Sequence, residues 1–204
     1  MPRSAKKLSL DVPDYEKIRE AAETAVRNEL GAIARPDDRV ERAAETIRQA
    51  DAEIALHIED RNAALASLYF HDLYEGAHLG RMAGITKNAV REIQSQAVYG
   101  DPKKRLPARM SDKELQKIAR KAKVPHITDS PGETLRENGK IIEAARARRG
   151  VAVVFMRDAA LALSEEPYGW DGPKIAEHAG VGKKLIWQQQ AAARAARERA
   201  QKQR

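Results

Sequence analysis

Hydrophobic residues along the chain recur every three or four positions rather than at every second position. This spacing places apolar side chains on one face of a helix, whereas strict alternation is typical of a half-buried strand. A first stripe before Gly31 consists of Ile18, Ala22, Ala25 and Val26. The preceding Asp11-Val-Pro-Asp segment is typical of a helix start. The pattern predicts an all-α protein.

A longer stripe follows after Pro36. Val40, Ile47 and Ile54 recur every seven residues, and the same face is filled by Ala43, Ala50, Ile58 and Leu65. The spacing predicts a long amphipathic helix, or a helical hairpin with the helix before it. Two interpretations stay open, because the stripe can pack inside the chain or against a second copy in a homodimer.

The second half of the chain repeats part of the first. Residues 61–97 align without a gap on residues 157–193, at an offset of 96, and 11 of the 37 pairs are identical. Pairs that differ often keep their physical character, as in Leu79/Ile175, Ile85/Val181 and Val90/Ile186. The repeat predicts two copies of one structural unit.

Each copy has the pattern of two short helices joined by a tight turn. In the first copy, a helix over 77–83 ends at Gly84, which adopts a positive φ at little cost. Ile85 fills the angle between the helices, and Thr86 is a good N-cap for the next helix. The second copy repeats this arrangement with Ile175, Ala176 and Ala179 packing, Gly180 turning, Val181 filling the angle and Ile186 facing inward.

Residues 79–90 and 175–186 resemble the helix-turn-helix of bacterial transcriptional regulators. The resemblance implies that the second helix of each unit enters a major groove of double-stranded DNA and presents outward residues to base edges. The residues in those outward positions are Thr86, Lys87, Asn88, Arg91, Lys183, Lys184, Trp187 and Gln188. Trp187 has a second interpretation, in which it packs against a neighbouring element.

The outward faces of the two copies differ. Gly182 stands where the first copy has Thr86, Trp187 replaces Arg91, and Lys87/Lys183 is the one outward identity. If both units bind DNA, they are expected to recognise different sequences.

The sequence predicts four consecutive segments. They are an N-terminal helical segment (1–36), a first helix-turn-helix domain (37–98), a basic linker with a short helix (99–132), and a second helix-turn-helix domain with a basic helical tail (133–204). In the linker, Ser111 and Glu114 form a capping box for a helix that ends near Lys123, and residues 128–133 are expected to be a loop.

Positive charge is concentrated in a few stretches. The formal net charge is +7, yet residues 99–124 carry nine Lys and Arg against three acids, and residues 183–204 carry seven against one. Such patches are typical of proteins that bind nucleic acids, although solvated basic faces have the same composition. The linker cations are expected either to contact phosphates or a minor groove, or to be solvated; they are Lys103, Lys104, Arg105 and Arg109.

Several function classes lack the residues they need. The chain has no Cys, its five His are not spaced as metal ligands, and it contains no phosphate-binding loop or nucleophile elbow. Carboxylates lie beside basic residues, as with Glu23 and Arg27, or Glu41 and Glu45 with Arg48, and indicate surface ion pairs. We expect no enzyme activity, no metal and no small-molecule cofactor. With no secretory signal or membrane span evident, the expected location is cytoplasmic, associated with the nucleoid.

Three functional hypotheses follow from these observations. The first is a sequence-specific DNA-binding transcriptional regulator, more in keeping with a repressor than an activator. The second is a plasmid or phage segregation or architectural protein that binds centromere-like arrays of sites. The third is a helical adaptor whose paired motifs bind a protein partner rather than bases.

Overall fold

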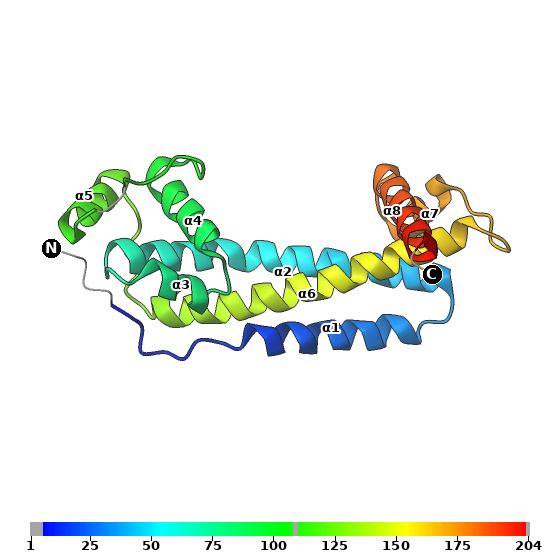
Figure 1. Cartoon of the computed structure of the whole chain (residues 1–204), viewed down its shortest axis with the longest axis horizontal. Coiled ribbons are helices and arrows are strands. Elements are labelled where there is room, and N and C mark those ends of the chain that lie inside the picture. Colours follow the sequence, from blue (N-terminus) through cyan, green and yellow to red (C-terminus); the bar gives the residue numbers. More distant parts are fainter. Residues whose placement is uncertain (1–5, 108–109, 203–204) are drawn as a thin grey trace. The chain divides into compact units, whose positions relative to one another are not determined.

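The computed structural model describes residues 6–107 and 110–202, and every regular element in these residues is an α-helix (Figure 1). Their one β-type contact is an isolated parallel bridge between Lys6 and Tyr74. The prediction of an all-α fold is therefore confirmed.

Eight helices follow one another along the described residues. In chain order they are α1 (Tyr15–Ala32), α2 (Pro36–Phe70), α3 (Gly76–Met82), α4 (Lys87–Tyr99), α5 (Asp112–Ala122), α6 (Pro131–Ser164), α7 (Gly172–Ala179) and α8 (Lys183–Lys202). A long helix followed by two shorter ones occurs twice, as α2–α3–α4 and as α6–α7–α8. The repeat is thus longer in structure than in sequence, since it includes the two long helices.

The helices form two compact units that are discontinuous in sequence. Unit 1 contains the described residues as far as Ile18 together with Ile54–Glu143, and unit 2 contains Arg19–Glu53 together with the described residues from Ala144 onward. This division differs from the four consecutive segments expected from the sequence. The reason is that α2 and α6 each contribute one half to unit 1 and the other half to unit 2.

Unit 1 is built around two clusters of buried apolar side chains. In the first cluster, the C-terminal part of α2 packs against α3, α4 and the first turns of α6, through residues that include Leu65, Leu79, Val90 and Leu135. In the second, α5 packs against the end of α2. Burying these side chains contributes on the order of 1.5–3 kcal/mol each and fixes which face of every helix points to solvent.

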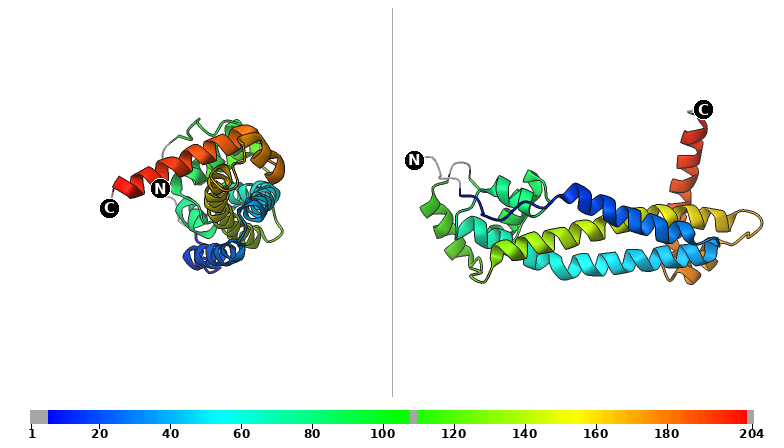
Figure 2. Two further views of the ribbon diagram at one scale, coloured as in Figure 1. Left: turned by 90° about the vertical axis from the view of Figure 1, so that its right-hand side faces the viewer. Right: turned by 90° about the horizontal axis from the view of Figure 1, so that it is seen from below.

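Unit 2 has a single cluster of the same kind. The N-terminal part of α2 packs against α1 and the C-terminal part of α6, and α7 and α8 close the cluster; its members include Val26, Val40, Ala152, Ile175 and Ile186. The later turns of α8 extend beyond α6 and α2 (Figure 2), in agreement with the exposure of most residues after Ala193. The apolar stripe of α2 therefore packs inside the chain, as one of the two interpretations predicts.

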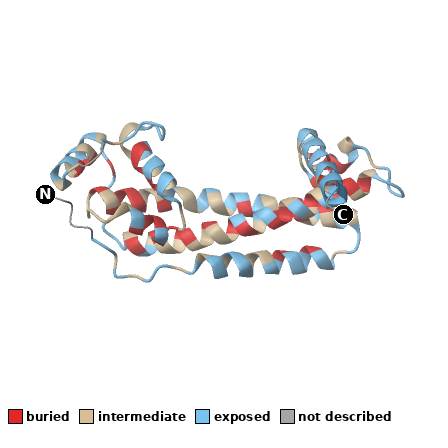
Figure 3. Ribbon diagram, viewed as in Figure 1, coloured by how far each residue is buried: buried red, intermediate tan, exposed pale blue. Residues whose placement is uncertain are grey.

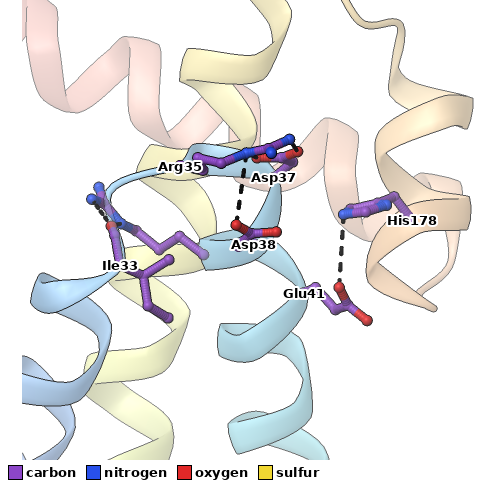
Figure 4. Close-up of polar contacts among 7 residues, drawn as sticks. Ile33, Arg35, Asp37, Asp38, Glu41 and His178 are labelled. Atoms are coloured by element: carbon purple, nitrogen blue, oxygen red, sulfur yellow. Dashed lines mark hydrogen bonds and ion pairs between the residues drawn. The ribbon is translucent and has the colours of Figure 1, made fainter.

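The entry to α2 in unit 2 is held by charged side chains (Figure 4). Arg35 pairs with Asp37, whose carboxylate lies in the first turn of the helix, and it also approaches Asp38. The hydrogen bond from Arg35 holds the pKa of Asp37 below its usual range. Arg39 donates to the carbonyl oxygen of Ile33 with an Nε–O distance of 2.9 Å. A carboxylate at a helix N-terminus is favourable because it faces the positive end of the helix dipole.

Local signals set the limits of the helices between the repeats. The capping box of Ser111 and Glu114 is present at the start of α5, which ends at Ala122 with Lys123 in a left-handed conformation, so this prediction is confirmed. The loop expected over 128–133 is shorter than predicted. Pro131 already begins α6, because proline is favourable in the first turn of a helix.

One surface ion pair expected from the sequence forms and another does not. Arg27 and Glu23 pair with an N–O distance of 2.9 Å. Glu45, by contrast, pairs with Arg42, while Arg48 donates a hydrogen bond to the carbonyl oxygen of Ala179. The Arg48 guanidinium satisfies a free carbonyl at the C-terminal end of α7, a contact that spacing along α2 does not indicate.

In the part of the chain that the structure describes, no helix combines the length and the apolar character needed to cross a membrane.

Candidate nucleic-acid interface

The α3–α4 pair, defined as residues 76–99, has the turn that the sequence predicts. Gly84 adopts a φ of +65°, and the backbone N–H of Ile85 donates to the carbonyl oxygen of Gly80 at 2.9 Å. Thr86 is the N-cap of α4, and its side chain accepts a hydrogen bond from the N–H of Ala89 at 3.2 Å. The direction of α4 is therefore set by local hydrogen bonds.

Burial decides which face of α4 is presented to solvent. Val90 is buried, and Ile85 and Ile93 are partly buried in the first cluster of unit 1. Every candidate residue on the opposite face is exposed: Thr86, Lys87, Asn88 and Arg91. Figure 3 shows this division along α4, with buried residues in red beside exposed ones in pale blue. The free N–H groups of the first turn make the N-terminal end of this face favourable for negative charge.

The loop after α4 brings three further candidates to the same unit. Lys103, Lys104 and Arg105 are all exposed. The fourth linker candidate, Arg109, lies outside the described residues. Lys103 and Arg105 line a groove together with residues of α4, and this groove has a volume of about 530 Å³. Helix and linker candidates that are up to 17 positions apart in sequence thus share one surface.

The α7–α8 pair, defined as residues 172–202, repeats the first with a different set of contacts. Asp171 caps α7 by accepting a hydrogen bond from the N–H of Lys174 at 2.8 Å. Gly180 adopts a φ of +63°, and the N–H of Val181 donates to Ala176 at 2.9 Å. The two turns therefore have the same conformation at the two glycines of the repeat.

The outward face of α8 begins with two lysines. Lys183, Lys184 and Gln188 are exposed, and Ile186 is fully buried on the opposite side. Trp187 is 56% exposed, and the edge of its ring lies close to Gly172 at the start of α7. Trp187 thus combines one ring edge packed beside α7 with an exposed surface, and both interpretations stay open.

Two side chains that sequence analysis did not identify hold the turns in place. In unit 1, the hydroxyl of Tyr15 donates to the carbonyl oxygen of Met82 at 2.6 Å, and its ring lies over Gly84. In unit 2, Nη1 of Arg48 donates to Ala179 at 3.0 Å. Each contact satisfies a carbonyl at the C-terminal end of the first short helix. No sequence signal marks them, because each donor comes from a helix distant in sequence.

The position of Tyr15 depends on a close approach to α6. A Cβ atom at Gly139 would lie 2.5 Å from the Tyr15 hydroxyl, so any side chain there would displace the tyrosine. Burial raises the pKa of Tyr15 well above its usual value, and the nearby carboxylate of Glu143 adds to the effect. The hydroxyl therefore stays protonated, and remains a hydrogen-bond donor, at a higher pH than an exposed tyrosine would.

Unit 1 contains two histidines whose rings stack and a third that is buried. The rings of His71 and His126 stack with centroids 4.6 Å apart, and His126 lies 3.8 Å from a carboxylate oxygen of Asp72. Among the described residues no group of three or more His, Asp or Glu side chains is arranged to hold a metal ion. His78 is buried in α3, where burial and the positive charges of Arg81 and Lys7 lower its pKa.

Comparison of the chain with protein-family models, with curated proteins and with solved structures gives no match.

Proposed function

We propose that the chain is a sequence-specific double-stranded DNA-binding protein of the transcriptional-regulator type. The α3–α4 and α7–α8 pairs act as two helix-turn-helix units, and α4 and α8 are the recognition helices. The observation that carries the proposal is the repeated combination of a left-handed glycine turn, a buried apolar stripe and an exposed basic N-terminal face.

The chemistry of these faces suits base edges in the major groove, which is about 12 Å wide and admits one helix. In α4, Lys87 matches the acceptors of guanine, and Asn88 matches the donor and acceptor of adenine. In α8, Lys183 and Lys184 match the acceptors of guanine, and Gln188 matches the donor and acceptor of adenine. Their position in the first turns agrees with the part of a recognition helix that reaches bases.

Trp187 gives α8 a property that α4 lacks. Its exposed ring offers an apolar surface to a thymine methyl group or a sugar, while its packed edge limits its motion. Arg91 stands at the equivalent position of α4. Because the two faces carry different donors and apolar groups, the units recognise different sequences, and the target site of one chain is a composite of two unlike blocks.

The direct test is selection of bound duplexes from a random DNA pool by the full chain. Enrichment of a site with two distinct sequence blocks is expected, and footprinting on that site should show protection over about two helical turns. Recovery of no preferred sequence after repeated rounds would overturn the proposal of sequence-specific binding.

Charge reversal on the recognition helices tests which surface is used. The double variant Lys87→Glu with Lys184→Glu is expected to lose binding to the selected duplex by at least about 100-fold, because both grooves would face a carboxylate. Lys113→Glu with Lys117→Glu, on the exposed face of α5, is the matched control, with the same change in net charge. Equal losses in the two variants would contradict the assignment of α4 and α8. Unchanged affinity in the first variant would favour the adaptor hypothesis.

A further inference from the structure

The groove beside α4 in unit 1 has two walls of different origin. One wall is a stripe along the helix formed by Asn88, Arg91, Glu92 and Ser95, which follow the spacing of a single helix face. The other is the loop after the helix, with Pro102, Lys103 and Arg105. Ser95 is only 3% exposed, so the groove reaches the level of the buried residues.

The loop wall is held in a defined conformation. Gly100 ends α4 with a φ of +66°, and its N–H donates to the carbonyl oxygen of Gln96 at 2.9 Å. The carboxylate of Asp101 then accepts a hydrogen bond from the N–H of Lys103 at 2.9 Å. An Asx turn of this kind favours a change of chain direction directly after the helix. The loop then lies beside α4, since Lys103 and Arg105 line the same groove as Asn88 and Arg91.

The far end of the loop is anchored as well. Leu106 packs against the second cluster of unit 1, which contains Phe70 and Leu115. Between the two anchors, the ammonium of Lys104 lies 4.4 Å from the centre of the Tyr99 ring. Lys104 thus contacts the end of α4, while Lys103 and Arg105 line the groove. This arrangement favours a binding role for Lys103 and Arg105 over the alternative in which the linker cations are only solvated.

The charges around the groove are unequal. Arg91, Lys103 and Arg105 supply three positive groups, and Glu92 supplies the only carboxylate among the lining residues. None of the three cations forms an ion pair with a described carboxylate. Guanidinium groups bind phosphate through paired N–H donors, and an ammonium group adds charge without directional demand. The groove therefore suits a compact anion with several acceptor oxygens.

We propose that this groove binds one backbone phosphodiester of DNA, with Arg91, Lys103 and Arg105 as its ligands. The inference rests on the proposed function and refines it. Arg91 becomes a backbone contact, so base recognition in unit 1 depends on Lys87 and Asn88, in the first turn of α4. A phosphate held between helix and loop sets the depth and register of α4 in the major groove.

The first experiment uses the full chain and its selected duplex. In the double variant Lys103→Gln with Arg105→Gln, the slope of log affinity against log salt should become less negative by about 0.9, the change expected when the contact with one phosphate is lost. The ranking of selected sequences should not change. Lys113→Gln with Lys117→Gln is the control, and an equal change of slope there would overturn the inference.

Replacing single phosphates by uncharged methylphosphonates identifies the contact. One position in the duplex should weaken binding of the native chain by about tenfold, and the same replacement should have little further effect on the Lys103→Gln with Arg105→Gln variant. If every methylphosphonate weakens the variant as much as the native chain, the groove does not hold a phosphate of the duplex.

A third measurement separates failure of this inference from failure of the proposed function. Amide NMR signals of the full chain are recorded during titration with inorganic phosphate, with chloride adjusted to keep ionic strength constant. Shifts confined to residues 88–105 would support an anion site even if no DNA sequence is selected. DNA selection without such shifts, and without the slope change, would overturn the groove site and leave the proposed function standing.

Discussion

The α3–α4 and α7–α8 pairs share a framework but are fixed to their units by different chemistry. Both turn at a left-handed glycine, and the repeat places Val90 and Ile186 at equivalent buried positions. In the first pair, an uncharged phenol from α1 lies over the glycine and donates to the carbonyl of Met82. In the second, a guanidinium from α2 donates to the carbonyl of Ala179, which is one position further along the repeat. The comparison shows that the inward residues of the repeat were retained while the supporting contacts diverged.

The surroundings of α4 and α8 diverge in the same way. Helix α4 is short, and the loop that follows it returns to form a groove with Lys103 and Arg105. Helix α8 continues instead to Lys202 and carries exposed cations on its later turns, including Arg194 and Arg199. Unit 1 therefore offers its positive charge in a concave site, and unit 2 offers it along an extended helix.

The largest expected difference concerns the two turn glycines. Gly84→Ala should destabilise unit 1 by about 3 kcal/mol or more, because a left-handed alanine costs about 1–2 kcal/mol and its Cβ would overlap the Tyr15 ring. The built Cβ lies 2.6 Å from that ring. Gly180→Ala should destabilise unit 2 only by the about 1–2 kcal/mol of a left-handed alanine. Its Cβ would meet no atom closer than the Arg48 side chain at 3.4 Å. Urea unfolding followed by circular dichroism gives both values, and equal costs would show that Tyr15 does not constrain the turn.

A smaller effect is expected from removing the two supporting hydrogen bonds. Tyr15→Phe keeps the ring over Gly84 but loses the donor to Met82, and should cost about 1 kcal/mol. Arg48→Met should cost a similar or smaller amount, because its donor is more exposed to water. Hydrogen exchange of the α4 and α8 amides shows which helix is destabilised in each variant. Increased exchange of α8 amides in the Tyr15→Phe variant would contradict the separate roles.

Raising the pH should weaken the Tyr15 hydrogen bond before it affects the Arg48 hydrogen bond. The folded chain raises the pKa of Tyr15, so unfolding releases a proton more readily above the ordinary tyrosine pKa of about 10. The contribution of the Tyr15 hydroxyl to the free energy of unfolding is fully present below about pH 10 and falls as the pH rises further. The loss at pH 10.5 is less than about 1 kcal/mol. Comparing unfolding of native and Tyr15→Phe chains from pH 8 to 10.5 isolates the effect. Parallel pH curves would show that the hydroxyl is not protected.

The smallest expected effects concern the N-terminal caps of α4 and α8. Thr86→Gly should destabilise α4 by a few tenths of a kcal/mol, and Gly182→Ser should stabilise α8 by about the same amount. Gly182 has negative or extended φ and open space at its Cβ position, so a side chain fits there. Thermal unfolding measures both changes. A destabilising Gly182→Ser would indicate that this glycine serves a contact other than capping.

Local features of the two pairs and of α5 were predictable from sequence. Gly84 and Gly180 at the turns, Thr86 as a cap, the Ser111 capping box and the inward Val90 follow from residue types and helical spacing. Each depends on neighbours within a few positions, where propensity and burial agree. The outward placement of Lys87 and Lys183 follows directly once the buried stripe is known.

Long-range features were not predictable. The contact of Tyr15 with Met82 spans 67 positions, and the tight packing at Gly139 becomes visible only when α1 and α6 are placed together. The length of α6 was missed because Pro131 and Gly132 suggest a loop, while burial of Leu135 and later residues favours a helix. The return of the 100–106 loop depends on where Leu106 packs, which no local pattern indicates.

The interleaved division of the chain has a consequence for its synthesis. Unit 2 takes residues from Arg19–Glu53 and again from Ala144 onward, with most of unit 1 translated in between. During translation, the first half of α2 emerges with α1 but about 90 residues before its partners in the second half of α6 and in α7 and α8, so unit 1 is completed first. In the interval, α1 alone is present to cover the apolar stripe of this half of α2. Truncation after Glu143 should therefore leave every residue of unit 1, including α4, in the chain. No single continuous fragment contains unit 2 alone, because its two parts lie on either side of most of unit 1 in the sequence.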